Sequence, residues 1–562
     1  MLDYTAVVLD GRTLGWRTPH TEDVVEIVRR FHRDSALAVL LRLNLALTHH
    51  RPLDQQEILR RWLQPDLVDA VFTVMREEQT THVFHEGQIL NLIRLVILNS
   101  PPDDGFRCTR PEEFHLLMRA MLWMSDLMFP YSGRAQARES VFTNFTRSEL
   151  FMHDEHYVPH VMARNYDLFV MLPRIVERQD SYFDIAGGFQ ALTGMEIEDY
   201  VGLGFGLLTH YDTIDVSLIG DAAIGVQRAT YLTGVRLPEE RRDGLWGVLS
   251  KPVAAYRDAL RTEWDSTTEP ARWFAMRTFS QFPMIEFPDG TVVAVSRRLL
   301  RDRITHGIYW VLANGLTPDD RQAFTNFFGD LFEEYVRRCF LRALGRSFRA
   351  RPKYGRGHLP LVDGALVMPR SLGLPECKAG RLLLNVREVG SEADLHRSVE
   401  PGLERAATQI AGAIQGGQRG EITDIATGPG TRYYPIIVTY EALPSHPFAL
   451  EVYERIIHRN SRLQGEGIKP VTLLNTRDVE SLEALIQDGE AWPDLLTRKH
   501  TGRYRFVPFH NYVYRRFGGT IPRNDYLRAR WDRIGNIIGM RLFGKPLEAP
   551  GSRDRRRPRR RR

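Results

Sequence analysis

Apolar residues recur at three- and four-residue intervals along most of the first 315 residues, and this spacing predicts a mostly helical region. The first helix is expected to begin at Thr21, because a hydroxyl residue followed by two acids is a typical helix start. A short hairpin is expected over residues 4–16, where Asp10-Gly11 is a favoured turn pair. Further helices are expected over residues 54–63, 66–80, 86–99, 111–128 and 160–178.

The pattern changes near residue 317. Thr317 can cap a helix that starts at Pro318 and ends at about Leu344, before Gly345. Short apolar runs then predict strands at residues 359–368, 374–377, 382–386, 434–440 and 470–475. Helices are expected from Ser391 to about residue 415 and over residues 478–488. This order predicts a fold of the α+β or α/β class, in which a central mixed sheet follows the helical region.

Two clusters in the helical region have weak chemical signatures. The glycines at 202, 204 and 206 lack the order of a nucleotide-binding loop, so a loop or a packing role is expected there. The second cluster consists of metal-ligand residue types: His153, Asp154, Glu155, His156 and His160. Pro159 interrupts the helix that would align these side chains, so an ordinary polar surface is the stronger interpretation.

Composition narrows the class of protein. The chain has 562 residues, of which 43% are hydrophobic and 26% charged, as is ordinary for a soluble globular protein. No apolar run approaches the roughly 18 residues of a membrane helix, and the N-terminus lacks the basic start of a signal peptide. Cys108, Cys339 and Cys377 are few and scattered, which is typical of reduced thiols. A cytoplasmic protein without membrane contact is therefore expected.

The formal net charge of +5 is unevenly distributed along the chain. Residues 1–250 hold 24 arginines and 35 acids, a net charge of −11, whereas residues 501–562 hold 18 bases and 4 acids, a net charge of +14. The acidic region suits nucleic acid poorly, so it is expected to bind a protein partner or to regulate the rest of the chain. The Arg-rich residues 551–562 are expected to be disordered, either as an arm for polyanions or as a solvated tail.

Bases alternate with aromatic residues over residues 501–550. Such a mixture can neutralise phosphates and stack on nucleobases, which is typical of nucleic-acid contacts. The alternative is that the aromatic rings belong to the core and the arginines form its exposed rim. The expected nucleic-acid contacts are Arg503, Tyr504, Arg505, Arg515, Arg516, Arg528, Arg530 and Trp531.

Three residues within the predicted sheet have the chemistry of a metal site. Glu376 and Lys378 are two apart on a predicted strand and share a face, while Cys377 points to the opposite one. A neighbouring strand can bring Asp363 beside Glu376. Two carboxylates and a lysine suit Mg²⁺ or Mn²⁺ and the hydrolysis of phosphodiesters. The lysine stands out because the chain has only six lysines.

Simpler interpretations of these residues stay open. An acid two residues before a lysine is expected about once by chance in a chain of this composition. Asp363-Gly364 is also a favoured hairpin turn. Glu376 and Lys378 can form a surface salt bridge on an edge strand.

Residues 320–480 resemble the PD-(D/E)XK nuclease superfamily, whose αβββαβ core carries an Asp and then Glu-x-Lys on adjacent strands. Asp363 and the run Glu376-Cys377-Lys378 match this motif, although Val362 stands where many members have proline. The helix before the core often reads G-x-x-F-E-x-Y-V, and residues 329–336 match it. The resemblance implies that Glu333 on this helix is a further metal ligand.

Two further residues follow from the same comparison of motifs. Gln409 resembles the glutamine that several branches of the superfamily carry on the helix after the lysine. Glu334 shares the helix face of Asp330 and Arg338, so it is expected in a solvated ion pair rather than at the metal.

The resemblance implies a Mg²⁺- or Mn²⁺-dependent endo- or exonuclease with a restriction-endonuclease-like core, and DNA is the expected substrate in preference to RNA. Asp363, Glu376 and Glu333 would bind the metal, and Lys378 and Gln409 would complete the catalytic set. Phage defence and DNA repair in a bacterium are both compatible with it. Two alternatives stay open, a catalytically silent nucleic-acid-binding or assembly protein that keeps this fold, and a scaffold unrelated to nucleic acid.

The expected domain organisation is linear. Residues 1–315 are expected to form a mostly helical regulatory or partner-binding region of one or two subdomains. The remaining segments are a nuclease-like domain over 316–500, a basic aromatic-rich segment over 501–550 and the tail over 551–562.

Overall fold

The computed structural model of the chain describes residues 11–546, except 13, 48–59, 61–64, 78–83, 108–110, 130–137, 153–157, 177–180, 215–223, 270, 355–358, 361, 423–424 and 521–522. The described residues form two compact units that interleave along the chain. Unit 1 takes residues up to 136, 189–311 and 538–547, and unit 2 takes residues 137–188 and 312–537. This division differs from the linear one expected from the sequence, because residues 137–188 pack with the later part of the chain.

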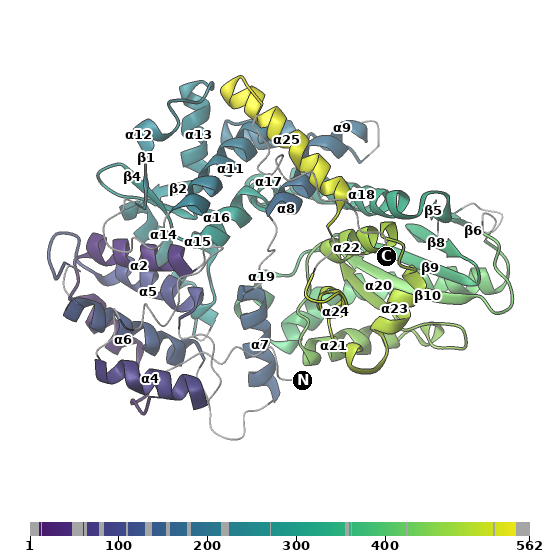
Figure 1. The fold of residues 1–562 in the computed structure, drawn as a ribbon, viewed down its shortest axis with the longest axis horizontal. Coiled ribbons are helices and arrows are strands. Elements are labelled where there is room, and N and C mark those ends of the chain that lie inside the picture. Colours follow the sequence, from purple (N-terminus) through teal and green to yellow (C-terminus); the bar gives the residue numbers. More distant parts are fainter. Residues whose placement is uncertain are drawn as a thin grey trace. The chain divides into compact units, whose positions relative to one another are not determined.

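Unit 1 is mainly helical, as the apolar spacing predicts. Its central helix is α5, which is buried from Glu86 to Leu98. The helices are α1 (Thr21–Val28), α2 (Arg33–Leu47), α4 (Pro65–Glu77), α5 (Glu86–Asn99), α6 (Pro111–Met128), α11 (Ile197–Thr213), α12 (Arg228–Tyr231), α13 (Glu239–Leu249), α14 (Val253–Asp265), α15 (Arg277–Gln281) and α16 (Arg297–Ile304), with α10 (Ile185–Thr193) and α17 (Gly307–Gly315) at its boundaries (Figure 1).

Unit 1 also contains a small sheet that the sequence pattern did not indicate. Its four short strands lie in the order β1-β4-β3-β2, and they are β1 (Val226–Gln227), β2 (Ser250–Pro252), β3 (Met284–Glu286) and β4 (Thr291–Ala294). Strands of two to four residues are too short to display the alternation on which a sequence-based prediction depends.

Unit 2 contains the predicted sheet. Its helices are α7 (Arg138–Met152), α8 (Val158–Tyr166), the π-helix η1 (Asp167–Met171), α9 (Leu172–Ile175), α18 (Pro318–Leu344), α19 (Leu384–Glu388), α20 (Glu392–Gln418), α21 (Pro447–His458), α22 (Thr476–Gln487), α23 (Trp492–Lys499), α24 (Phe509–Arg516) and α25 (Asp525–Phe543), which runs on into unit 1. Its strands are β5 (Phe348–Ala350), β6 (Lys353–Tyr354), β7 (Leu359–Pro360), β8 (Gly364–Met368), β9 (Ser371–Lys378), β10 (Arg432–Thr439) and β11 (Thr472–Asn475).

Five strands of unit 2 form a mixed sheet in the order β11-β10-β9-β8-β5, with β5 at one edge. β8 runs antiparallel to both β5 and β9, whereas β9, β10 and β11 run parallel to one another. Along the chain, three strands of this sheet, β5, β8 and β9, lie between helices α18 and α20, and strand β10 follows α20. The chain is therefore of the α+β class, with predominantly helical structure around two mixed sheets.

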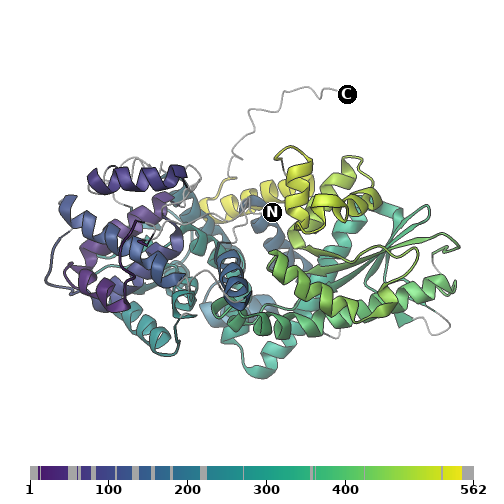
Figure 2. The ribbon, with the colours of Figure 1, turned by 90° about the horizontal axis from the view of Figure 1, so that it is seen from below.

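Helices cover both faces of this sheet (Figure 2). On one face, Leu372 and Leu374 of β9 join the hydrophobic core that α20 supplies through residues such as Leu403 and Ile410. On the other face, Gly373 of β9 makes room for the indole of Trp492 at the start of α23. Alternate residues of β9 thus face α20 and α23, and the even-numbered ones belong to the α20 face.

Most of the predicted elements of unit 2 are present. α18 begins at Pro318 with Thr317 as its cap, and α20 begins after the cap Ser391. The predicted strand over 359–368 is divided, because residues 359–360 pair with β6 while β8 begins at Gly364. Strand β5 was not predicted, since its three residues are too short for a pattern. Residues 4–10 of the predicted hairpin and nearly all of the predicted helix over 54–63 lie outside the described residues.

The predicted strand over residues 382–386 is wrong. Residues 384–388 form α19, and the buried side chains of Leu382 and Val386 are four residues apart, on one side of that turn. Both edges of β9 are already paired with β8 and β10, so a strand that follows β9 directly could not pair beside it. The peptide N–H of Leu382 instead donates to the carboxylate of Glu441, at 3.1 Å.

The glycines at 202, 204 and 206 lie inside α11, so the loop interpretation is wrong and the packing interpretation holds. A Cβ at Gly204 would lie 2.8 Å from the side chain of Ile304, which shows how closely α11 approaches α16. Within the part of the chain that the structure describes, none of the helices combines the length and the apolar character that a bilayer crossing requires.

Candidate metal-dependent active site

Asp363 and Glu376 occupy opposite positions on neighbouring strands. β8 and β9 pair through Leu366 and Gly373, and continuing that antiparallel register by three residues sets Asp363 across from Glu376. On the other side of Asp363, the N–H of Arg351 donates to the Asp363 carbonyl oxygen at 3.1 Å. A row of residues thus crosses the sheet, from Arg351 through Asp363 to Glu376.

Glu376 is the most enclosed member of this row, because only 2% of it is exposed. Its Oε1 accepts a hydrogen bond from Lys378 Nζ at 2.5 Å, and the same ammonium donates to Gln409 Oε1 at 3.0 Å. Glu376 and Lys378 share the face that α20 covers, so Gln409 on α20 reaches the lysine directly. Glu376 Oε2 is buried and has no hydrogen-bond partner among the described residues.

Asp363 lies in a bend just before β8, at the opposite end of that strand from the β8–β9 turn. The turn itself is Pro369-Arg370, where Arg370 has a φ of +56°. Asp363 Oδ2 accepts a hydrogen bond from the N–H of Cys377 at 2.7 Å, which ties the carboxylate to β9. Gly364 has a packing role, because a Cβ there would lie 2.6 Å from the ring of Phe348. Asp363-Gly364 is therefore not the turn of this hairpin.

Burial and neighbouring negative charge raise the pKa of both carboxyl groups. The pKa of Asp363 is raised above its ordinary value, first by burial and then by the negative charge of Glu333. The pKa of Glu376 is raised as well, first by burial and then by Asp363, and Lys378 offsets only part of this. Burial of two acids side by side without a matching set of cations is costly to stability. Such an arrangement is typical of a functional site.

Glu333 on α18, whose charge acts on Asp363, is paired with a cation that sequence reasoning did not identify. Arg351 Nε and Nη2 donate to the two carboxylate oxygens of Glu333, at 2.6 and 2.8 Å. Arg351 follows directly after β5 and has a φ of +41°, a conformation rare for a residue with a side chain. Glu334 pairs with Arg337 and Arg338, as expected of a residue on the outer face of α18.

The donor set around Asp363 and Glu376 suits a hard cation. Carboxylate and amide oxygens are the ligands that Mg²⁺ and Mn²⁺ prefer. Glu376 Oε2, which has no hydrogen-bond partner among the described residues, is such an oxygen. Across the described residues, however, no three His, Cys, Asp or Glu side chains are grouped as a metal-binding cluster. Glu333, the third predicted ligand, has both carboxylate oxygens engaged by Arg351.

The predicted nucleic-acid contacts of the rear segment fall into two classes. Arg530 is committed within unit 2, because its Nε lies 2.7 Å from Asp167 Oδ1 and its Nη2 donates to the hydroxyl of Tyr526. The sequence pattern predicts Arg530 as a phosphate contact, and the structure shows it in this ion pair. Tyr504 packs edge-on against the buried Tyr512, and Trp531 is half-buried. The exposed members are Arg503, Arg505, Arg515, Arg516 and Arg528.

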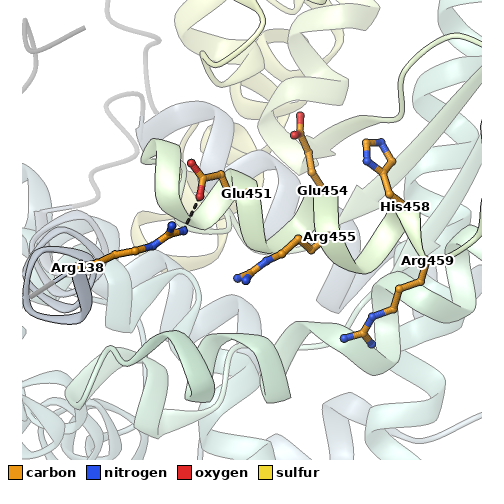
Figure 3. A pocket seen from close by; sticks show the side chains of 6 residues that line it. All are labelled: Arg138, Glu451, Glu454, Arg455, His458 and Arg459. Atoms are coloured by element: carbon orange, nitrogen blue, oxygen red, sulfur yellow. Dashed lines mark hydrogen bonds and ion pairs between the residues drawn. The ribbon is translucent and has the colours of Figure 1, made fainter.

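The remaining candidates are the predicted histidine cluster and a surface cavity. His153, Asp154, Glu155 and His156 lie outside the described residues, and burial lowers the pKa of His160 to about 4. A surface cavity of about 580 Å³ lies along α21, where Arg138 pairs with Glu451 at 2.5 Å (Figure 3). Its other lining residues are Glu454, Arg455, His458 and Arg459, so it is separate from the carboxylate pair.

Comparison of the chain with protein-family models, with curated proteins and with solved structures found no match. The interpretation of the site therefore depends on its own geometry and on the sequence motifs.

Proposed function

We propose that this protein is a metal-dependent nuclease that hydrolyses phosphodiester bonds of nucleic acid, with DNA as the preferred substrate. The observation that carries the proposal is the position of Asp363 opposite Glu376, with Lys378 bridging Glu376 and Gln409. The order of α18, three strands, α20 and β10 agrees with the αβββαβ order of the PD-(D/E)XK superfamily that the motifs resemble.

Asp363 and Glu376 would hold the cation, and Glu333 would join them on leaving Arg351. A bound divalent cation supplies a water of lowered pKa and polarises a phosphoryl oxygen. The ammonium of Lys378 is fixed by two acceptors and is 19% exposed, so it can hold a water or neutralise charge on a phosphate. Burial of Glu376 keeps this chemistry away from bulk water.

A second candidate is a nucleic-acid-binding protein that keeps the fold without cleaving its ligand. The observation that favours it is the ion pair between Arg351 and Glu333, which leaves only two carboxylates free to face a cation. The two candidates differ in whether this ion pair opens when divalent cation and nucleic acid are present.

The test is incubation of the purified full chain with linear and circular DNA, and with RNA, in Mg²⁺, in Mn²⁺ and in EDTA. Cleavage in either cation and none in EDTA is expected, together with its loss in Asp363→Asn and in Glu376→Gln. Cleavage that persists in both variants would assign the activity to another site or to a contaminant. Tight binding without cleavage in any cation would favour the second candidate.

A further inference from the structure

The edge strand β5 and the residues around it carry an unusual concentration of positive charge. Residues 335–362 contain eight arginines and lysines and no aspartate or glutamate. Three of these arginines, at 337, 338 and 342, are paired with acids within unit 2. Arg346 and Arg349 are exposed, and no ion pair with an acid involves either of them among the described residues.

The register of the sheet sets this charge beside the carboxylates. Arg349 pairs with Ala365, which belongs with Leu374 to the core under α20, so position 349 lies on the α20 face of the sheet. The next row on that face, two residues along, runs from Arg351 through Asp363 to Glu376. Two strand residues span about 6.6 Å, so Arg349 is one step from the row that holds the proposed site.

The guanidinium of Arg351 extends the same surface toward the metal ligands. Its side chain is 57% exposed even while it is paired with Glu333. Arg349 donates to the backbone carbonyl oxygen of Arg346, which places the Arg349 guanidinium beside the backbone of Arg346. Charged residues on an edge strand also prevent edge-to-edge pairing, but either sign of charge serves that purpose. The exclusive use of bases here points to an anionic partner.

We infer that the edge strand β5, through Arg346 and Arg349, is the surface on which the sugar-phosphate backbone of nucleic acid lies as it enters the site at Asp363 and Glu376. This inference rests on the proposed function for the identity of the site, and it transfers the main phosphate contacts from the segment after residue 501 to β5. Guanidinium groups bind phosphate oxygens through paired hydrogen bonds, which suits contacts that fix the register of a backbone without reading its sequence.

The experiment measures binding of a fluorescein-labelled DNA duplex in EDTA, so that cleavage plays no part. The variant is Arg346→Ala/Arg349→Ala, and the matched comparison is Arg515→Ala/Arg516→Ala, which removes the same charge from α24. The β5 variant is expected to bind roughly tenfold more weakly at about 50 mM salt, and its slope of log K against log salt is expected to flatten by about 1.8. The α24 variant is expected to change both quantities by less than half as much.

An α24 variant that loses as much affinity as the β5 variant, or more, would overturn the inference, as would a full chain that binds no DNA. Thermal melts of both variants are measured alongside, and the β5 variant should match the full chain, since no ion pair with an acid involves Arg346 or Arg349 among the described residues. A chain that binds DNA through β5 and never cleaves it would contradict the proposed function and leave this surface in place. Cleavage with unchanged kinetics in the β5 variant would contradict the inference about β5 and leave the proposed function in place.

Discussion

Arg351 donates to both carboxylate oxygens of Glu333, at 2.6 and 2.8 Å, and so engages the acid whose charge raises the pKa of Asp363. The backbone N–H of Arg351 also donates to the Asp363 carbonyl oxygen, so one residue contacts two of the three proposed metal ligands. Its positive φ indicates that the surrounding structure imposes this position. Arg351 is therefore in a position to control how many carboxylates face the cation.

Arg351→Ala is expected to raise the affinity for Mn²⁺ by roughly tenfold, because Glu333 becomes available as a third anionic ligand and affinity for hard cations increases with ligand charge. The measurement is a titration of the metal-bound fraction by electron paramagnetic resonance, which needs no turnover. Arg349→Ala is the matched control, since Arg349 lies two residues away and contacts no acid that the structure records.

An affinity that stays the same or falls in Arg351→Ala would show that Glu333 does not compete for the cation. The double variant Arg351→Ala/Glu333→Gln then gives a second test. It is expected to return the affinity to that of the unmodified chain or below it, because the added ligand is removed again.

Asp363→Asn is expected to stabilise the metal-free protein at about pH 8 by roughly 1–2 kcal/mol. The neutral amide can still accept the hydrogen bond from the N–H of Cys377, and it ends the repulsion with Glu376 and Glu333. Thermal melts in EDTA measure this gain. In Mn²⁺ the variant is expected to lose the metal-induced rise in Tm. This result would show that the substitution gains stability by removing a metal ligand.

The pH dependence of this gain follows from the raised pKa of Asp363. Between its ordinary pKa and the raised one, the folded chain holds a proton that the unfolded chain has released, so the stability of the unmodified protein falls as pH rises. Below the ordinary pKa the carboxyl is neutral in both states and the two proteins should differ little. A gain that is largest in acid would contradict this explanation.

The arrangement of Glu376, Lys378 and Gln409 in the candidate site was largely predictable from the sequence, because these residues sit on long, regular elements. Glu376 and Lys378 are two apart on the eight-residue strand β9, and Gln409 lies on the 27-residue helix α20, so their relative directions follow from ordinary periodicities. Asp363 was the uncertain member, since Asp-Gly is equally compatible with a turn. Only the register of β8 against β9 decides between the two.

The features that escaped prediction depend on contacts between distant parts of the chain. Arg351 belongs to no recognised motif. It follows a three-residue strand and pairs with Glu333, 18 positions earlier in the sequence, so only the folded chain shows this contact. The basic run around β5 was visible as composition, but its location beside the carboxylates required the sheet order. Arg530 was predicted to contact phosphates because it lies among bases that alternate with aromatic residues. Its ion pair with Asp167 could not be foreseen, because Asp167 lies in a segment assigned to another domain.

Lys378→Ala and Lys378→Arg are both expected to abolish cleavage. Binding of DNA in EDTA should stay within about twofold of the unmodified chain, because the alanine variant loses one positive charge of many and the arginine variant loses none. Arginine fails because its planar fork cannot occupy the position of an ammonium fixed between Glu376 and Gln409. Lys469→Ala, which removes a lysine elsewhere in unit 2, is the control. Cleavage at the normal rate in Lys378→Ala would identify the Glu-x-Lys run as a chance occurrence.

Arg164 and Glu480 provide a test of how the chain divides into units. Arg164 on α8 donates to both oxygens of Glu480 on α22, at 2.6 and 2.8 Å, and the hydroxyl of Tyr335 on α18 donates to the same carboxylate at 2.6 Å. Both charged side chains are almost fully buried. This network attaches the segment of residues 137–188 to the sheet-bearing part of unit 2.

Arg164→Ala is expected to destabilise the fold by roughly 3–5 kcal/mol, because it leaves the buried charge of Glu480 without its cation. A fall in Tm on the order of 10 °C follows for a unit of this size, and the same fall should appear in the metal-dependent activity measured across temperature. The control is Arg397→Ala, which removes an exposed i,i+3 partner of Asp394 on α20 and should cost less than about 1 kcal/mol.

Replacing both partners with apolar residues, as in Arg164→Met/Glu480→Leu, should recover much of the loss because no unpaired charge remains buried. If Arg164→Ala melts like Arg397→Ala, residues 137–188 contribute little to the stability of the sheet, and the linear division of the chain at residue 315 would describe its folding better than the interleaved one.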